Sequence, residues 1–303
     1  MITRLTLTPQ PPFHFEAAAY SHGWAVLAPT RWDAERRALL RVERLAGGKV
    51  LALEITGAGT ASAPIIHIDV ESETPLASAA AEQIRRIVAH MFRLEEDLSG
   101  FYALCTGQGE PWASAGAGLG RLLRSPTLFE DTVKTIATTN TQWSGTKRMI
   151  NALVDALGEP LPGDPTRRAF PTPQAMAAAP PKLFTQAARF GYRGPYVAEL
   201  ARRVAAGELD LEGLLHSDQP TAELKKELLA IKGVGPYAAA TLLMLIGRYD
   251  EIAYDTVFRD FVSARYFRGE RPHPSVMMAV YDEWGAWRYL AYWLELWLDD
   301  PDA

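Results

Sequence analysis

The sequence predicts an α+β protein in which an antiparallel sheet with a packed helix precedes a mostly helical region. Three observations support this fold class. Alternating apolar residues flank a glycine turn in the first third of the chain, a helical spacing follows them, and strand patterns give way to helix boundaries beyond about residue 105. We therefore expect two domains, a sheet and helix domain over residues 1–104 and a helical domain over residues 105–303.

The predicted sheet begins with a hairpin. Leu51, Leu53 and Ile55 alternate with small or polar residues, and Gly47-Gly48 separates them from an apolar run over residues 40–45. Paired glycines permit the positive φ that a tight hairpin turn requires. A further strand is expected over residues 65–70, followed by an amphipathic helix. The helix is predicted from apolar residues at three- and four-residue spacing, namely Ile84, Ile87, Val88, Met91 and Phe92.

Helix boundaries are frequent in the rest of the chain. Ser125-Pro126 has the form of an N-cap followed by proline, Gly158 ends a helix that begins near residue 144, and Gly194-Pro195 opens a helix that ends at Gly207. Five prolines between residues 160 and 173 indicate an irregular stretch. We expect the last two thirds of the chain to be almost entirely helical.

Composition excludes several classes of protein. Of 303 residues, 48% are hydrophobic and 22% charged, which is typical of a globular chain and not of a disordered or fibrous one. No apolar run reaches the roughly 18 residues of a membrane span. The N-terminus lacks the apolar core of a signal peptide, so we expect a cytoplasmic protein without a membrane partner. The single cysteine, Cys105, excludes an intrachain disulfide, a thiolate zinc site and a four-cysteine iron–sulfur cluster.

The distribution of charge is compatible with a polyanionic partner. The net charge of −5 argues mildly against nucleic acid, because phosphate contacts need Lys and Arg. Residues 101–268, however, hold 19 basic and 17 acidic side chains, so the excess acid lies in the flanks. The six histidines show no ligand spacing, and we expect no metal site.

The most informative segment runs from Leu224 to Phe261. An apolar helical stripe ends at Gly233-Val234-Gly235, and Pro236 starts a second apolar helix, so a helix-hairpin-helix is predicted over residues 224–247. The amides of Gly233, Val234 and Gly235 should point outward at a helix N-terminus, an arrangement that suits a phosphate oxygen. The structural alternative is a turn that only joins two packed helices.

An aspartate follows the hairpin at a distinctive distance. Asp255 lies 20 positions after Gly235 and directly before a helix expected over residues 256–266. Together these features resemble the helix-hairpin-helix and Gly/Pro-rich-Asp (HhH-GPD) superfamily of DNA glycosylases, which implies a two-lobed helical domain. Other segments extend the resemblance. Residues 10–15 and 284–291 are similar to bacterial 3-methyladenine DNA glycosylase II, and residues 122–124, 136–140, 170–172 and 191–197 resemble the 8-oxoguanine glycosylases.

The resemblance implies roles for two groups of residues. Asp255 would be the catalytic carboxylate that stabilises an oxocarbenium-like transition state, although an N-cap is the plain structural reading of the same residue. Tyr237 and Trp287 would line the pocket for the damaged base, with core packing as the alternative for Trp287. Tyr237 occupies the position at which bifunctional relatives carry a nucleophilic lysine, so we expect no Schiff base and no AP-lyase activity.

A third group of residues would act on the DNA duplex. By resemblance to the 8-oxoguanine enzymes, Asn140, Tyr192 and Arg193 would fill the gap left by the flipped base and contact its former partner. An ordinary exposed turn is the alternative for Tyr192 and Arg193. Gly145 stands where those enzymes carry a second arginine, which puts selectivity for the opposite base in doubt.

The expected function is that of a monofunctional DNA glycosylase of base excision repair. It would hydrolyse the N-glycosidic bond of a flipped damaged purine, with alkylated bases preferred, and leave an abasic site. The partner would be double-stranded DNA, and the protein would act as a monomer, cytoplasmic and nucleoid-associated. The resemblance requires no cofactor and allows a monovalent cation at the hairpin carbonyls. Two alternatives stay open: an 8-oxoguanine or other oxidised-base glycosylase, and a non-catalytic helix-hairpin-helix DNA-binding protein.

Overall fold

The computed structural model describes residues 1–299, with Asp299 described by its backbone alone. The described chain divides into two compact units, each built from two separate stretches of sequence. The first unit combines residues 1–97 with residues 117–212, and the second combines residues 98–116 with the chain from Gly213 onward. Whether residues 1–104 and 105–303 are separate folding domains stays a prediction.

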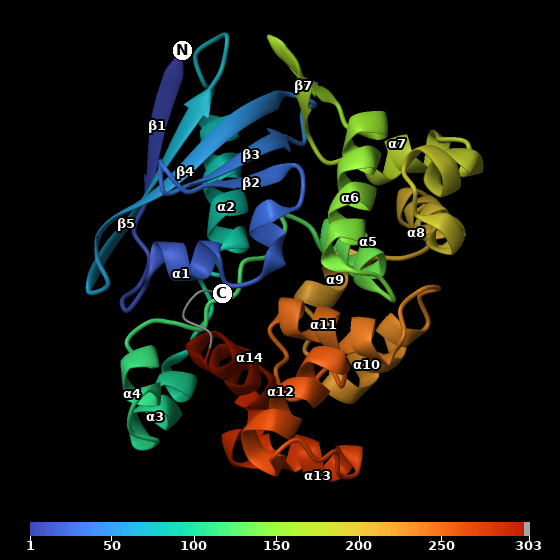
Figure 1. Cartoon of the computed structure of the whole chain (residues 1–303). Coiled ribbons are helices and arrows are strands. Elements are labelled where there is room, and N and C mark those ends of the chain that lie inside the picture. The colour runs from blue at the N-terminus through green and yellow to red at the C-terminus, as the bar shows by residue number, and fades with distance from the viewer. Residues whose placement is uncertain (300–303) are drawn as a thin grey trace. The chain divides into compact units, whose positions relative to one another are not determined.

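A five-stranded antiparallel sheet forms the beginning of the first unit, which confirms the predicted fold class (Figure 1). The strands run in the order β1-β5-β4-β3-β2. Their bounds are β1 (Ile2–Leu7), β2 (Thr30–Asp33), β3 (Ala38–Arg44), β4 (Val50–Thr60) and β5 (Ala63–Glu71). The hairpin register pairs Val42 with Ala52, and Gly48 has φ 84° in the turn, as the paired glycines predicted.

Helices cover the apolar faces of the sheet. Helix α2 (Ser78–Met91) lies against one face and buries Ile84, Val88 and Met91, as its spacing predicted (Figure 1). The short helix α1 (Phe15–Ala19) packs on β4 so closely that a Cβ on Gly57 would lie 2.4 Å from the Cβ of Phe15. A 3₁₀ turn, η1 (Gly23–Val26), leads into β2.

The rest of the first unit is mainly helical. Its elements are α5 (Leu128–Thr138), α6 (Trp143–Leu157), α7 (Pro173–Ala178), the π-helix η2 (Leu183–Ala187), η3 (Gly191–Arg193), α8 (Gly194–Ala205) and the start of α9 (Leu211–Leu215). The expectation of an almost entirely helical region was wrong at the proline-rich stretch. There β6 (Pro160–Leu161) and β7 (Asp164–Arg168) form a hairpin, because Gly163 takes φ 82° in the turn and prolines are tolerated at strand edges.

The second unit consists of helices over its described residues. They are α3 (Ser99–Gly107), α4 (Trp112–Ala115), α10 (Thr221–Leu229), α11 (Pro236–Ile246), α12 (Thr256–Phe267), α13 (Pro274–Met278), η4 (Ala279–Trp287) and α14 (Arg288–Asp299). The apolar run of α11 is buried along most of its length. This buried helix fixes the hairpin at its N-terminal end.

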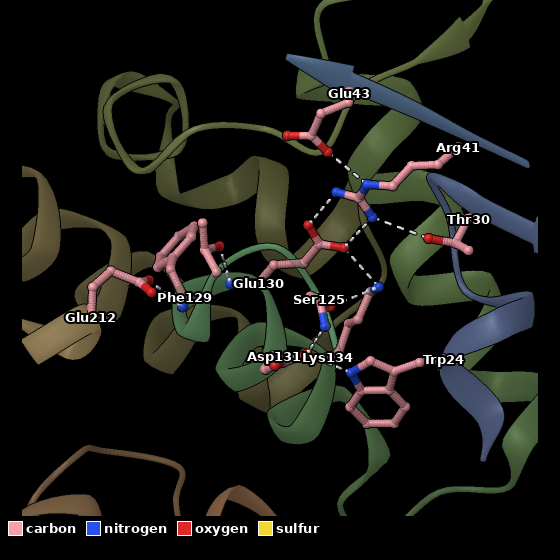
Figure 2. A network of polar contacts seen from close by, with 11 residues as sticks. Trp24, Thr30, Arg41, Glu43, Ser125, Phe129, Glu130, Asp131, Lys134 and Glu212 are labelled. Atoms are coloured by element: carbon pink, nitrogen blue, oxygen red, sulfur yellow. Dashed lines mark hydrogen bonds and ion pairs between the residues drawn. The ribbon is translucent and has the colours of Figure 1, made fainter. Parts of the chain in front are cut away.

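A buried polar network joins α5 to the sheet in the first unit (Figure 2). Glu130 on α5 accepts two hydrogen bonds from the Arg41 guanidinium of β3, at 3.0 and 2.7 Å. One turn further along α5, the Lys134 ammonium lies 2.7 Å from Oε1 of the same carboxylate, the oxygen that also accepts from Nη1 of Arg41. Glu43 pairs with Arg41 at 2.6 Å. All four side chains are buried, so the charges are compensated within the network and not by water.

Opposite charges outweigh burial at the centre of this network. Burial raises the pKa of Glu130, but the charges and hydrogen bonds of Arg41 and Lys134 lower it to about 2. Burial prevails at Glu43, whose pKa is raised despite the Arg41 charge. Glu130 is therefore the ionised group on which both buried cations depend.

The same network moves a predicted helix start. Ser125-Pro126 does not begin α5: the Ser125 hydroxyl, the atom that would cap a helix, accepts from the Lys134 ammonium at 3.2 Å, and the Ser125 N–H donates to the Asp131 carboxylate at 2.9 Å. The helix begins at Leu128, and Thr127 is its N-cap, accepting from the backbone N–H of Glu130 at 3.2 Å. The glycine boundaries of α6 and α8 lie within two residues of their predicted positions.

Candidate functional site

The hairpin between α10 and α11 forms as predicted. Ile231 and Val234 are buried, and Gly233 between them has φ 89°, a conformation that favours glycine. Pro236 is at the first position of α11, where a missing N–H costs nothing. The turn is thus held by two apolar contacts and one left-handed glycine.

The three hairpin amides are not equivalent. The expectation that all of them point outward was wrong for Val234, whose N–H donates to the Ile231 carbonyl at 3.0 Å. Gly235 is exposed, and no atom lies within 4 Å of the position that a Cβ would take there. The backbone at Gly235 is therefore open to close approach by an anion at the start of α11.

Asp255 is fixed by the loop that precedes it and the helix that follows it. On the loop, Asp250 accepts from the Thr221 hydroxyl at 2.9 Å, and Glu251 pairs with Lys225 at 2.8 Å, so α10 anchors this segment. The Tyr249 carbonyl accepts from the N–H of Tyr289 at 2.8 Å, which ties the loop to α14. These contacts hold the start of α12 in place.

The Asp255 carboxylate is the N-cap of α12, as the sequence predicted. Its Oδ1 accepts from the backbone N–H of Phe258 at 2.8 Å. The side chain is half-buried, and burial raises its pKa, opposed by hydrogen bonds from the N–H groups of Phe258 and Val257 and by the charge of Arg259. A carboxylate of this kind combines an oriented charge with incomplete solvation.

Two buried tyrosines of α14 lie in the electrostatic field of Asp255. Burial raises the pKa of both Tyr289 and Tyr292, and the charge of Asp255 and the phenol of Tyr237 raise them further. Both phenols therefore stay protonated. Tyr289 is also hydrogen-bonded to Thr241, whose hydroxyl donates to the Tyr237 carbonyl at 3.0 Å. Tyr237 and Asp255 thus both influence the ionisation of one pair of tyrosines.

Tyr289 and Tyr292 were not predicted from the sequence as site residues. Their spacing of three residues, with the phenol as a polar tip on an otherwise apolar helix, is the signal that could have found them. Trp287, by contrast, was predicted. It is half-buried, stacks on Tyr249 with ring centroids 5.6 Å apart, and contacts Phe101 at 5.8 Å. Its role in a base pocket stays a prediction.

The predicted duplex-contacting residues come together in the first unit. The Asn140 amide donates to the Tyr192 hydroxyl at 3.3 Å, and the Arg193 guanidinium carbon lies 4.4 Å from the centre of the Tyr192 ring. Asn140 is exposed and Tyr192 is 57% exposed, whereas Arg193 is 7% exposed. Two of the three side chains are therefore presented to solvent and the third lies beneath them.

Metal-ligating side chains do not cluster in the part of the chain that the structure describes: no three His, Cys, Asp or Glu residues are grouped to hold an ion. Across residues 1–299, the helices are also too short or too polar to cross a membrane. A monovalent cation at the hairpin stays a prediction.

The fold and the hairpin with its aspartate define a known class of DNA repair protein. Residues 133–286 match the family model of the HhH-GPD superfamily of base excision DNA repair proteins, and the chain belongs to this superfamily. Among curated relatives, the DNA-3-methyladenine glycosylase of Bacillus subtilis (strain 168) is 26% identical over 180 residues, which cover 58% of this chain and 58% of that protein.

Solved structures share the fold over nearly the whole chain. The 3-methyladenine DNA glycosylase from Archaeoglobus fulgidus has a TM-score of 0.76 at 19% identity, and the match covers 99% of this chain and 100% of that chain. The 8-oxoguanine glycosylase/lyase of Clostridium acetobutylicum has a TM-score of 0.71 at 18% identity, and the match covers 98% of both chains. At these identities the likeness concerns the fold.

Proposed function

We propose that this protein is a DNA glycosylase that hydrolyses the N-glycosidic bond of a damaged base flipped out of double-stranded DNA. One observation carries the proposal. Asp255 is a half-buried, hydrogen-bonded carboxylate at a helix N-terminus, and it lies 20 residues beyond a helix-hairpin-helix whose Gly235 backbone is exposed. Membership in the HhH-GPD superfamily supports the assignment.

The proposed chemistry uses Asp255 in its ionised form. Cleavage of the bond between base and sugar builds positive charge on the sugar, and a fixed carboxylate lowers the energy of that transition state. One oxygen, Oδ1, is already oriented by the Phe258 N–H. The carboxylate can then stabilise the cation and orient or deprotonate the attacking water. The neutral phenols of Tyr289 and Tyr292 add no competing charge beside it.

We propose alkylated purines as the preferred substrates. A cationic alkylpurine is attracted to the electron-rich face of an aromatic ring, and Tyr237 supplies such a ring at the start of α11. The curated relative is named for 3-methyladenine. The second candidate, an oxidised-base glycosylase, is favoured by the grouping of Asn140, Tyr192 and Arg193.

Release of free bases tests the function and its substrate class together. Duplexes carrying 3-methyladenine, 7-methylguanine, ethenoadenine, hypoxanthine or 8-oxoguanine are incubated with the protein, and the freed bases are quantified. Faster release of the alkylated bases supports the proposal, and faster release of 8-oxoguanine favours the second candidate. Duplex binding without release of any base would leave the non-catalytic alternative.

Tyr237 makes a prediction about the product. A phenol at this position provides no amine for a Schiff base, so the product is an intact abasic site. Borohydride treatment of the reacting complex is expected to trap no covalent protein–DNA adduct. An adduct trapped with the wild-type protein would show that an amine elsewhere in the chain attacks the sugar and that the protein is bifunctional.

The two hairpin glycines give a matched pair of tests for DNA binding. Gly235→Ala is expected to weaken duplex binding about tenfold, because the new Cβ obstructs the approach of a phosphate to the backbone. A tenfold change in affinity corresponds to the loss of roughly one hydrogen bond to a charged group. Gly235→Ala should change the free energy of unfolding by less than about 0.5 kcal/mol, since Gly235 has φ −93° and open space around it. Gly233→Ala should instead cost about 1–2 kcal/mol of stability, because φ is 89° there.

Fluorescence anisotropy with labelled duplex and urea denaturation measure these two quantities. Gly107→Ala is the control, because this exposed glycine at the end of α3 also has open space around it. Equal affinity of the Gly235→Ala and Gly107→Ala variants would mean that phosphate does not approach the hairpin. We also propose that the protein binds DNA as a monomer. Its proposed location is the cytoplasm.

A further inference from the structure

The Arg193 side chain points into its own unit. Its Nε donates to the Thr139 hydroxyl at 3.1 Å, and its Nη2 donates to the carbonyls of Thr139 and of Asn140, the latter at 3.0 Å. With only 7% of the residue exposed, these donors face protein and not solvent. Nε and both hydrogens of Nη2 are therefore used within the fold.

These bonds fall at the end of α5, where backbone carbonyls lack helical partners. Thr139 is the C-cap of α5, and Asn140 after it has φ 45°, a left-handed conformation that is strained for a residue with a side chain. A cation at this point is favourable because the helix C-terminus carries partial negative charge. Arg193 thus stabilises the backbone that presents Asn140.

The same guanidinium supports the second exposed residue. It stacks at 4.4 Å on the ring of Tyr192, and the Tyr192 hydroxyl accepts from the Asn140 amide at 3.3 Å. Asn140 and Tyr192 come from segments 52 residues apart. Arg193, which directly follows Tyr192 in the chain, joins the two segments in addition, since it bonds to the backbone of Thr139 and Asn140 and stacks on Tyr192.

The opposite end of α5 is fixed as well. Glu212 accepts from the N–H groups of Leu128 and Phe129 at 3.0 and 3.1 Å, and the Arg41 and Glu130 pair holds the first turn of the helix (Figure 2). These contacts hold the N-terminal turn of α5, whereas the loop after its C-terminal end is held by the hydrogen bonds from Arg193. The position of Asn140 then depends on the Arg193 contacts at that loop.

We propose that Arg193 is a positioning residue for the Asn140 and Tyr192 pair and does not read the base opposite the lesion. This inference rests on the proposed function. Asn140 and Tyr192 then enter the duplex as a preformed pair. Gly145, which precedes Thr146 on α6, supplies no side chain of its own, and a Cβ there would lie 2.4 Å from the Thr141 hydroxyl. Excision should consequently depend little on the opposite base.

The test measures insertion separately from chemistry. In an Asp255→Asn background, 2-aminopurine is placed opposite the lesion, and its fluorescence reports entry of the pair into the duplex. Arg193→Met is expected to weaken insertion of the pair into the duplex by about tenfold or more. This factor corresponds to the free energy of the lost hydrogen bonds to a charged group. Arg193→Lys keeps the positive charge, but an ammonium cannot bond to both carbonyls and stack on the Tyr192 ring at the same time. This variant should therefore recover only part of the lost insertion. Thr139→Val should show a smaller loss, and Arg4→Met on β1 is the matched control.

Base release with A, C, G or T opposite the lesion supplies the second measurement. The four wild-type rates should differ from one another by less than about fivefold. A bidentate contact to the opposite base would discriminate between bases by at least this factor. Arg193→Met should lower all four rates alike. A loss confined to one opposite base, with Thr139→Val unchanged, would overturn the inference and show base reading. Unchanged insertion by a folded Arg193→Met variant, judged by circular dichroism, would overturn it too.

Failure of the proposed function gives a different result. If wild type released no base while 2-aminopurine insertion still depended on Arg193 and Thr139, the glycosylase assignment would fall and the positioning role would stand. If bases were released and insertion did not depend on Arg193, the positioning role alone would fall.

Discussion

Replacing Asp255 by asparagine is expected to reduce base release by about 10²- to 10³-fold or more while leaving the protein folded. Asparagine keeps the shape and the N-cap oxygen that accepts from the Phe258 N–H. It loses the negative charge that stabilises the sugar cation. Single-turnover release of the best substrate, together with urea denaturation, checks both halves of the expectation.

Asp255→Ala is the matched variant that separates catalysis from capping. It should lose activity to the same degree, and in addition about 1 kcal/mol of stability, because alanine cannot cap α12. If Asp255→Asn released bases at the wild-type rate, Asp255 would be a cap alone and the glycosylase mechanism proposed for it would be wrong.

The raised pKa of Asp255 fixes the direction of two pH effects. Burial holds the folded-state pKa above the ordinary value of 3.8, so the protonated carboxyl is favoured in the folded protein. The stability that this gives is fully present below the unfolded-state pKa and is lost as the pH rises through the folded-state pKa. Asp255→Asn should therefore be equally or more stable than wild type at pH 7. Activity should fall as the pH drops through the raised pKa, which a pH–rate profile measures.

The largest expected loss of stability follows from Glu130→Gln. This change leaves Arg41 and Lys134 buried without their shared anion, and breaking a buried ion pair on one side typically costs about 3–5 kcal/mol. Urea denaturation measures the free energy of unfolding. The control is Glu82→Gln, an exposed residue of α2 that pairs with Arg85 at 3.6 Å and should contribute less than about 1 kcal/mol.

The pKa of Glu130 predicts how this contribution depends on pH. The cations around Glu130 outweigh its burial and lower its folded-state pKa from 4.5 to about 2. Its stabilisation is therefore present above the unfolded-state pKa and is lost as the pH falls toward about 2. The difference between wild type and Glu130→Gln should shrink over that range. A constant difference from neutral pH to pH 2 would mean that the ionised carboxylate does not carry the effect.

Local signals were reliable where neighbouring residues decide the conformation. The N-cap at Asp255, the glycine end of α6 and the left-handed turn at Gly233 all depend on residues a few positions away. Ser125 failed as a predicted cap because its hydroxyl accepts from the buried Lys134 ammonium, while its N–H bonds to the Asp131 carboxylate, which is also held by the indole of Trp24 from a distant part of the chain. At Ser125, these tertiary contacts outweighed the local capping propensity.

The same limit applies to the candidate site. The resemblance to the 8-oxoguanine enzymes named Asn140, Tyr192 and Arg193 together, and the structure places them side by side, but the resemblance did not show that Arg193 faces inward. Tyr289 and Tyr292 were not singled out, because an aromatic residue on an apolar helix has the same pattern whether it is core or site. A glycine motif also does not predict that the Val234 N–H donates to the Ile231 carbonyl within the turn.

The sequence by itself determined the α+β class, the helix-hairpin-helix and the carboxylate 20 residues beyond it, because periodicity, glycine, proline and capping act over short stretches of backbone. Only the tertiary structure decided which charged groups are buried and what they bind. Glu130 meets Arg41 from 89 residues away, and Arg193 meets Thr139 from 54 residues away. Burial and charge pairing are properties of such contacts, and they set the ionisation of Glu130 and the inward orientation of Arg193.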